Sequence, residues 1–468
     1  MDNDNENHKY QYTDKEKHSQ APTMRPLQPV GAKLMQKSSV EPSSDLSPDN
    51  GTSYGRPPKN PAIIGALCGL LGLVIGGVGI YGLLQIARPL KSECVECDCP
   101  QCPNSENASA SDLNTAFLTL EPQGQNIIYS PLSIRYGLSL LNSGAASTTK
   151  SQIENVLGSE PLPRYENIPE TLSLANAVFI KDSFAGQVRP SYVDIVQNDY
   201  ASEIIYDDFA SSQTMDDWVD QKTFGLIKQI GAQVDASTKM VLANALAIQM
   251  PWAHQFDSGS THDRSFYKEN DEEVQAEMMS GLAYAEDIKY YTGDNLTALS
   301  LPLQSTEAGT NLDFTAIMPH GKLQDYISSF GTSALDDIAQ KSIPANTPED
   351  GVQIYIPKFK FDHKLDFEND LKSLGVTQAF TEDADFSAMA DIPLMVSGAS
   401  HQANIEFSED GIKAAAVTSF SIAGAAASQD PPDPVIIDIN RPFLFVIRDR
   451  DNGAIWFTGA VYEPKVSD

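Results

Sequence analysis

The segment from Glu409 to Pro442 restricts the fold of this chain most, because it has the character of a strand and of a loop. Between Gly411 and Gly424 there is no proline and a single charge, on Lys413. Alternate positions there are small or apolar: Ile412, Ala414, Ala416, Thr418 and Phe420. This period of two is typical of a strand buried on one face. The chain then continues into three alanines and SQDPPDP, which predicts an exposed loop. We therefore expect a segment that can move from a loop into a sheet.

Charge divides the 468 residues into a neutral tail and an acidic remainder. Residues 1–60 hold eight basic and eight acidic residues, are rich in Asn, Ser and Pro, and predict a disordered tail. The formal net charge of −31 therefore lies beyond them. Such acidity argues against nucleic acid as a partner, because binding phosphate requires positive charge. The simpler interpretation is that acidity keeps the domain soluble.

Residues 62–87 form a run of 26 residues without a charge. A helix of that length slightly exceeds the ~30 Å hydrocarbon core of a bilayer, so we expect one transmembrane helix over 61–88. A cleaved signal peptide fits poorly, since 60 polar residues come first. A buried core helix is the remaining alternative, although core helices are rarely apolar all round. Basic residues flank both ends equally and leave the orientation open.

Two patterns surround this run and predict association between chains. Five glycines share one helical stripe, which would let two helices approach closely: Gly65, Gly69, Gly72, Gly76 and Gly79. Four cysteines follow in a predicted stalk, residues 89–108: Cys94, Cys97, Cys99 and Cys102. They could form disulfides between chains, hold zinc or an iron–sulfur centre, or belong to an incidental or lipid-modified stalk. The stripe could also reflect only the ordinary glycine content of membrane helices.

The remainder, residues 109–468, predicts a mixed α+β domain. We expect helices over 109–118, 134–141 and 217–230 from their apolar spacing, and strands over 241–250 and 352–361. Residues 443–461 predict two buried strands around a turn at 449–453. Strands and helices do not alternate strictly, which favours the α+β class.

Seven sequence blocks in this domain resemble the serpin family. They begin at Asn126, Trp218, Val241, Phe266, Ile356, Ala384 and Asn440, and include NIIYSPLSIRYGLSLLNSGAASTTKSQIENVLG and NRPFLFVIRDRDNGAIWFTGAVYEP. They stand in the family's order and cover roughly Ser109 to Pro464. The resemblance implies three β-sheets, about eight or nine helices and an exposed reactive loop.

The resemblance also implies a suicide inhibitor of serine proteases, with no catalytic residue, cofactor or metal of its own. In serpins the protease cuts the loop and forms an acyl-enzyme, and the freed hinge then inserts into the main sheet. The hinge here comprises Glu409, Gly411, Ile412, Ala414, Ala415, Ala416 and Thr418. Ile412 stands where the family usually has Thr or Ser, and Lys413 where it usually has Glu.

Counting along the family pattern places the reactive bond between Ala425 and Ala426, with Ala426 or Ala427 available in place of Ala425 by slippage. Alanine suits the shallow pocket of an elastase-like or subtilisin-like protease, whereas a trypsin-like enzyme requires a basic side chain. The expected partner is therefore an elastase-like or subtilisin-like serine protease.

Two further groups of residues match family positions. Ser130, Ser133, Asn244 and His401 match the shutter, where hydrogen bonds exchange as the strands of the main sheet separate. Trp252 and Lys358 match the region where the loop first inserts, and we expect an ion pair between Lys358 and Glu409.

These features together predict a single-pass membrane protein with an extracellular inhibitor domain, a cytoplasmic tail and a homodimer formed through helix and stalk. That orientation follows from where a protease inhibitor would be useful. A non-inhibitory serpin acting as a surface binding module is the main alternative. A metal-dependent stalk built on the cysteines is a third.

Overall fold

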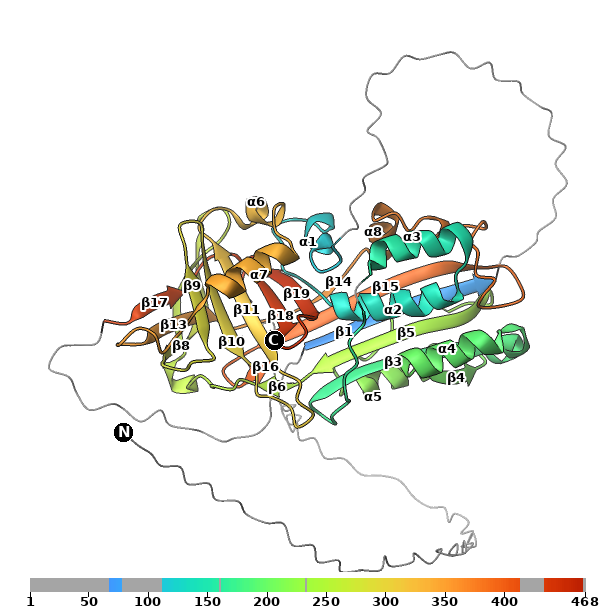
Figure 1. Cartoon of the computed structure of the whole chain (residues 1–468), viewed down its shortest axis with the longest axis horizontal. Helices are drawn as coiled ribbons and strands as arrows, with labels where there is room; N and C mark the ends of the chain where they lie inside the picture. The colour runs from blue at the N-terminus through green and yellow to red at the C-terminus, as the bar shows by residue number, and fades with distance from the viewer. Residues whose placement is uncertain (1–66, 78–111, 160, 232–233, 413–432, 466–468) are drawn as a thin grey trace, which may run out of the picture. The chain divides into compact units, whose positions relative to one another are not determined.

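The computed structural model describes residues 67–77, 112–159, 161–231, 234–412 and 433–465 (Figure 1). In these ranges eight α-helices accompany sheets of six, seven, four and two strands. The mixed α+β class and the three larger sheets agree with the sequence-based expectation. The polar tail, residues 1–60, lies outside the described ranges, as does the cysteine cluster.

The main sheet has six strands in the order β14-β15-β1-β5-β3-β4. Their bounds are Phe359–Lys364, Leu394–Phe407, Leu67–Gly77, Thr238–Ile248, Leu172–Lys181 and Glu203–Asp207. Strand β1 pairs antiparallel with both β15 and β5 (Figure 1). The earliest described segment thus lies at the centre of a sheet whose other strands follow it by more than ninety residues.

The prediction of a transmembrane helix over 61–88 is wrong for Leu67–Gly77, which form strand β1. The physical reason is that a strand covered on both faces is as continuously apolar as a membrane helix, so hydropathy does not separate them. Within the described residues, none of the helices has the length and apolar character needed to cross a bilayer. The other residues of 61–88 lie outside the described ranges, and so does part of the glycine stripe.

Helices cover both faces of the main sheet. One face carries α2 (Pro131–Gly144), α3 (Ser147–Leu157) and α4 (Pro190–Tyr200), and α8 (Phe367–Ser373) packs beside β15 (Figure 1). The other face carries α5 (Gln213–Lys222), which packs on β3 and β5. Helix α1 (Ala116–Leu120) precedes them and contains only the end of the helix expected over 109–118.

The helix expected over 217–230 ends at Lys222. Phe224 and Gly225 have positive φ of 55° and 82°, which an α-helix does not tolerate. The Thr223 hydroxyl stabilises this ending, since it donates to the Val219 carbonyl and accepts from the Ile227 amide. The chain beyond it then crosses the same face of the main sheet that α5 covers, as far as Ile230.

The seven-stranded sheet has the order β12-β9-β10-β11-β18-β19-β2. Its strands are Ile343–Pro344, Lys289–Thr292, Leu296–Pro302, Leu312–Pro319, Phe443–Asp449, Ile455–Val461 and Ile127–Tyr129. The two strands predicted within 443–461 are β18 and β19. Helices α6 (Leu323–Ile327) and α7 (Thr332–Lys341) lie in the connection between β11 and β12.

Two smaller sheets complete the described fold. The four-stranded sheet has the order β17-β13-β8-β7, with bounds Val435–Asp438, Val352–Pro357, Glu273–Ala283 and His262–Tyr267. The two-stranded one pairs β16 (Gly411–Ile412) with β6 (Met250–Pro251). The single strand predicted over 352–361 is divided between β13 and β14, which belong to different sheets. Pro357 lies at this division, and proline supplies no amide hydrogen to a ladder.

Candidate functional site

The centre of the main sheet is the place to which the predicted shutter residues converge. Leu71 of β1 lies opposite His401 on β15 and opposite Asn244 on β5. Leu71, Leu73 and Ile75 are fully buried and belong to the core beneath the helices. We call this place, between β5 and β15, the central position of the main sheet.

Strand β1 fits the central position closely on both faces. A Cβ on Gly137 of α2 would lie 1.6 Å from Leu71 Cδ2, so the glycine makes room for the leucine. On the opposite face, a Cβ on Gly72 would lie 3.3 Å from Ser400 Oγ and 3.6 Å from Ile230 Cγ1. The strand is therefore enclosed between α2 and the segment that follows α5.

All four shutter residues are buried and hydrogen-bonded around this position. The Ser130 amide donates to His401 Nε2 at 3.0 Å, and the Ser130 hydroxyl donates to the Trp456 carbonyl at 2.7 Å. The Ser133 hydroxyl donates to Asn244 Oδ1, and each of the four side chains has zero exposure. The network joins the start of α2 to both strands that flank β1.

Ser130 also fixes the beginning of α2. Its hydroxyl accepts the Ser133 amide at 3.1 Å as an N-cap, and Pro131 stands at the first helical position. The sequence SPLS therefore places two hydroxyls at the centre of the sheet through ordinary helix-capping chemistry. This explains why residues 130 and 133 reach strands far away in the sequence.

The described part of the hinge is Glu409, Gly411 and Ile412. Gly411 has φ of 142°, and a Cβ there would lie 2.5 Å from the Met250 carbonyl oxygen, so only glycine fits. Ile412 is fully buried opposite Met250. Residues 413–432 lie outside the described ranges, and with them Ala414, Ala415, Ala416, Thr418, Ala425 and Ala426.

The residues expected where the loop first inserts surround this hinge. Lys358 Nζ lies 3.3 Å from Glu409 Oε2, so the anticipated ion pair is present. Glu409 also accepts the Thr261 hydroxyl at 2.7 Å. The Trp252 indole donates to the Ser408 carbonyl at 2.8 Å, and its amide donates to the Asp410 carbonyl at 3.1 Å. Lys358, Thr261 and Trp252 thus all bind the chain at the start of the predicted hinge.

Sequence reasoning missed two contributors to the site. Asn176 of β3 accepts the Asn244 amide at 2.8 Å and extends the polar network by one strand. Leu71 occupies the centre of the site itself. Asn176 has a recognisable signal, because it is a lone amide within the apolar run LSLANAVFI. Leu71 has none, since hydropathy assigned its whole segment to a membrane.

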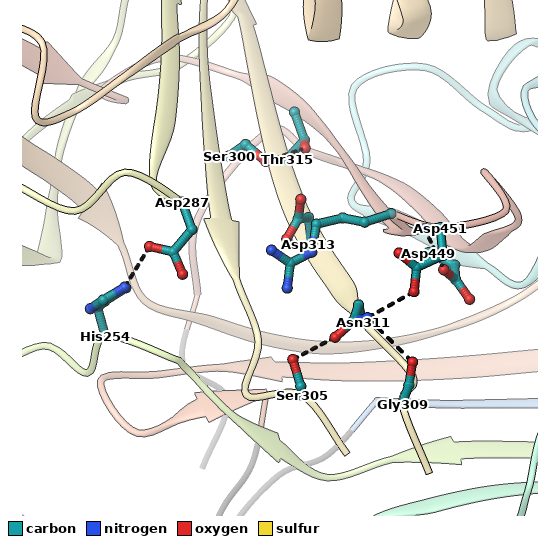
Figure 2. Close-up of polar contacts among 11 residues, drawn as sticks. His254, Asp287, Ser300, Ser305, Gly309, Asn311, Asp313, Thr315, Asp449 and Asp451 are labelled. Carbon is teal, nitrogen blue, oxygen red and sulfur yellow. Dashed lines mark hydrogen bonds and ion pairs between the residues drawn. The ribbon is translucent and has the colours of Figure 1, made fainter. Parts of the chain in front are cut away.

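A second feature is a cavity of about 490 Å³ between α7 and strands β10, β11 and β18. Ser300 and Thr315 share a hydrogen bond of 3.1 Å on its wall, and Asp313 lies beside them on β11 (Figure 2). Asp313 pairs with Arg450 Nε at 3.2 Å. Burial raises the pKa of Asp313 to about 6, against the lowering effect of Arg450. Charged and apolar side chains therefore line the same cavity.

Among the described residues there is no group of three or more His, Cys, Asp or Glu side chains arranged to hold a metal ion. The cysteines proposed as ligands or disulfide partners, Cys94, Cys97, Cys99 and Cys102, lie outside these residues.

Comparison with known protein families gives one clear match. The family model described as "Serpin (serine protease inhibitor)" matches residues 105–464. Curated relatives include Serpin-Z1B of Triticum aestivum, 32% identical, and Serpin-ZX of Hordeum vulgare, 31% identical. Each alignment covers 73% of this chain and 91% of the relative. Proteins of this family are generally protease inhibitors rather than enzymes.

Solved structures share the fold. The thermophilic serpin tengpin, in its native state, has a TM-score of 0.63 at 24% identity, covering 81% of this chain and 97% of tengpin. A complex of thyroxine-binding globulin with thyroxine has a TM-score of 0.62 at 23% identity, covering 76% and 99%. With the family match over residues 105–464 and the shared architecture, this chain belongs to the serpin family.

Proposed function

We propose that this serpin is a suicide inhibitor of serine proteases that traps its target by inserting the cleaved reactive loop into the main sheet. The observation that carries this proposal is the network around the central position. Ser130, Ser133, Asn244 and His401 place hydrogen bonds on β5 and β15, the two strands that would flank an inserted loop strand. A sheet that only had to be stable would favour apolar side chains at these buried sites.

The length of the loop supports insertion at the same place. Ser408 and Gly411 form an isolated antiparallel bridge at the end of β15. An antiparallel strand that continued from this bridge would bring Ala425 opposite Leu394, where the pairing of β1 with β15 now ends. A loop cut after Ala425 would therefore fill the central position to its far end.

The same register gives the sharpest test. It would bring Thr418 opposite His401, with its side chain on the buried face. Thr418→Arg should leave the loop cleavable but unable to insert, because an unpaired charge would be buried. Thr418→Val, the matched control at the same position, adds no charge and should behave as the wild type.

The experiment incubates each full-length variant with an elastase, in solution and in phosphatidylcholine vesicles, and counts complexes that survive denaturing electrophoresis. We expect Thr418→Arg to lower trapped protease about tenfold or more and to accumulate as cleaved chain. Ala416→Pro should act in the same way, because it removes a ladder donor. Equal trapping by Thr418→Arg and Thr418→Val would contradict insertion in this register.

The proposed target is an elastase-like or subtilisin-like protease, since alanine would precede the reactive bond between Ala425 and Ala426. Ala425→Arg should redirect inhibition toward trypsin, whose pocket carries an acid. A variant that still fails to inhibit trypsin and keeps its action on elastase would place the bond elsewhere, as at Ala427.

We further propose a single-pass location at the cell membrane through residues 62–87, with the serpin domain outside, the tail in the cytoplasm and a homodimer through helix and stalk. Leu67–Gly77 cannot be part of β1 and of a membrane helix at the same time, so this location applies to the chain only when β1 is out of the sheet. A non-reducing gel of membrane-extracted protein, beside a variant with all four stalk cysteines changed to serine, tests the disulfides. A wild-type monomer band would favour metal binding for Cys94 to Cys102.

A second candidate function, a non-inhibitory binding module, is favoured by the cavity between α7 and the seven-stranded sheet. Its Asp313, Lys289 and Arg448 could orient a small ligand that carries both charge and apolar surface. If no protease of an elastase, subtilisin and trypsin panel is trapped by the wild type under either condition, this function replaces inhibition.

A further inference from the structure

We propose that strand β1 blocks the main sheet and that a lipid bilayer removes the block by taking up the same residues. This inference rests on the proposed inhibitory function, because the blocked place is the one that the cleaved loop would need. Residues 62–87 would then have two alternative environments. The protein would be an inhibitor in one of them only.

The block follows from the pairing of β1. Its residues bond to β5 on one side and to β15 on the other, over almost the whole length of β1. With β1 in place, β5 and β15 offer no free edge to each other or to a further strand. A loop strand continuing from the Ser408–Gly411 bridge would require the same backbone partners, from Asn404 to Leu394. The two strands therefore exclude each other.

The composition of β1 makes it a replaceable strand. Four of its eleven residues are glycine, which loses more entropy on ordering and packs no side chain against the sheet. Its described burial comes from Leu71, Leu73 and Ile75 on one face. Backbone hydrogen bonds to β5 and β15 hold the strand, and another strand of the same direction could supply these bonds in its place.

A bilayer can offer the segment more than the sheet does. Eleven residues of the uncharged run are in β1, whereas a helix of all 26 would span about 39 Å and bury the whole run in a ~30 Å hydrocarbon core. A helix satisfies its own backbone groups there, and glycine is tolerated in membrane helices. Lipid should therefore withdraw β1 and leave the central position vacant.

The test compares the full chain in solution with the full chain mixed with phosphatidylcholine vesicles. Vesicle flotation measures binding to lipid, hydrogen exchange measures protection of β1, β5 and β15, and an elastase reports inhibition. We expect β1 amides to be protected in solution, with little trapped protease. With vesicles we expect flotation, faster exchange in β5 and β15, and about tenfold or more trapped protease.

A matched pair of variants separates the block from the lipid. Gly72→Pro removes a ladder donor in the middle of β1, while Gly79→Pro places the same change beyond the strand. Both keep residues 62–87 uncharged. Gly72→Pro should trap elastase in solution without vesicles, and Gly79→Pro should require vesicles as the wild type does.

The failures can be told apart. Equal trapping with and without vesicles, with β1 protected in both, would overturn the block. Unchanged protection of β1 on vesicles that carry the chain would overturn the competition with lipid. Protection of β1 that rises with protein concentration would overturn it in favour of a strand exchanged between two copies. A further outcome is that vesicles and Gly72→Pro both speed exchange in β5 and β15 while no protease is trapped. That outcome would keep the competition between sheet and lipid for β1 and would contradict the proposed inhibition.

Discussion

The two largest sheets of this serpin are built by opposite means. At the centre of the seven-stranded sheet, Phe314 and Phe445 stack with ring centroids 5.5 Å apart, and Trp456 is fully buried. At the centre of the main sheet stands β1, a glycine-rich strand beside buried hydroxyl, amide and imidazole groups. Stacked aromatic side chains hold the seven-stranded sheet together, whereas β1 combines three buried aliphatic side chains with four glycines. The proposed exchange of β1 would therefore change the main sheet and leave the other sheet intact.

The largest expected difference between the sheets comes from truncating one core residue in each. Phe445→Ala should lower the stability of the domain by about 4 kcal/mol, because it leaves a cavity among packed rings. Leu71→Ala should speed hydrogen exchange in β1 but change global unfolding by less than half as much, since the strand can leave. Urea unfolding with exchange measurements checks both. Equal losses would mean that β1 is as permanent as β18.

The next effect is the dependence of stability on pH, because one buried carboxyl group lies beside each of the two sheets. Burial and the nearby Glu121 raise the pKa of Asp370, beside β15, to about 7, and burial raises that of Asp313 to about 6. The folded state holds these protons more tightly than the unfolded chain, so stability should fall as pH rises from about 4 to 7. The drop should be at most about 4 kcal/mol for Asp370, at about 1.4 kcal/mol per pKa unit.

Asp370→Asn should remove its part of this drop, because the amide is neutral at every pH. The exposed Asp383→Asn is the control and should keep the wild-type profile. Thermal midpoints measured at intervals from pH 4 to pH 8 provide the measurement. A drop that persists in Asp370→Asn and ends near pH 6 would assign it to Asp313 and to the seven-stranded sheet.

A hydroxyl bonded to a strand of each sheet gives a smaller effect. Ser133→Ala removes a buried hydrogen bond to Asn244, and Thr315→Val removes one to Ser300. Each should cost about 1 kcal/mol of stability. Only Ser133→Ala should also change the rate at which elastase is trapped. A similar change of rate in Thr315→Val would remove the special role of the main sheet.

The smallest expected effect is at the hinge. Lys358 and Glu409 are 22% and 13% exposed at their side chains, and Lys358 is also 3.9 Å from Glu277. Lys358→Met should destabilise the domain by no more than about 1 kcal/mol, and high salt should reduce the difference. Unfolding midpoints at low and high salt check this. A larger loss would make the hinge, rather than β1, the main control of the sheet.

The sequence predicted those parts of the site whose chemistry is local. Ser130 and Ser133 were assigned through the family resemblance, and the helix cap at SPLS explains in physical terms why they lie where they do. The alternating small residues after Gly411 predicted a segment with both loop and strand character. The fold class and the two strands within 443–461 also followed from alternation and turns. Lys358 and Glu409 could be paired only through the family resemblance, since 51 residues separate them.

The sequence could not predict β1, because its apolar run satisfies a bilayer and a doubly covered strand equally well. The choice depends on two strand edges that form more than 150 residues later, at β5 and β15. Helix α5 was predicted too long for a related reason. The apolar spacing continues through Ile227 and Ile230, which pack on the sheet without being helical.

The hydrogen bond of the Trp252 indole allows the proposed loop insertion to be followed by tryptophan fluorescence. Of its three tryptophans, Trp218 lies against Phe179 with its indole near Glu203, and Trp456 lies against Tyr165. Trp252 is the one whose indole donates to the hinge, at the Ser408 carbonyl. Hinge movement would expose or re-bond that indole, so a change in emission could be assigned by a Trp252→Phe control. Loop insertion could then be followed in real time without an attached dye.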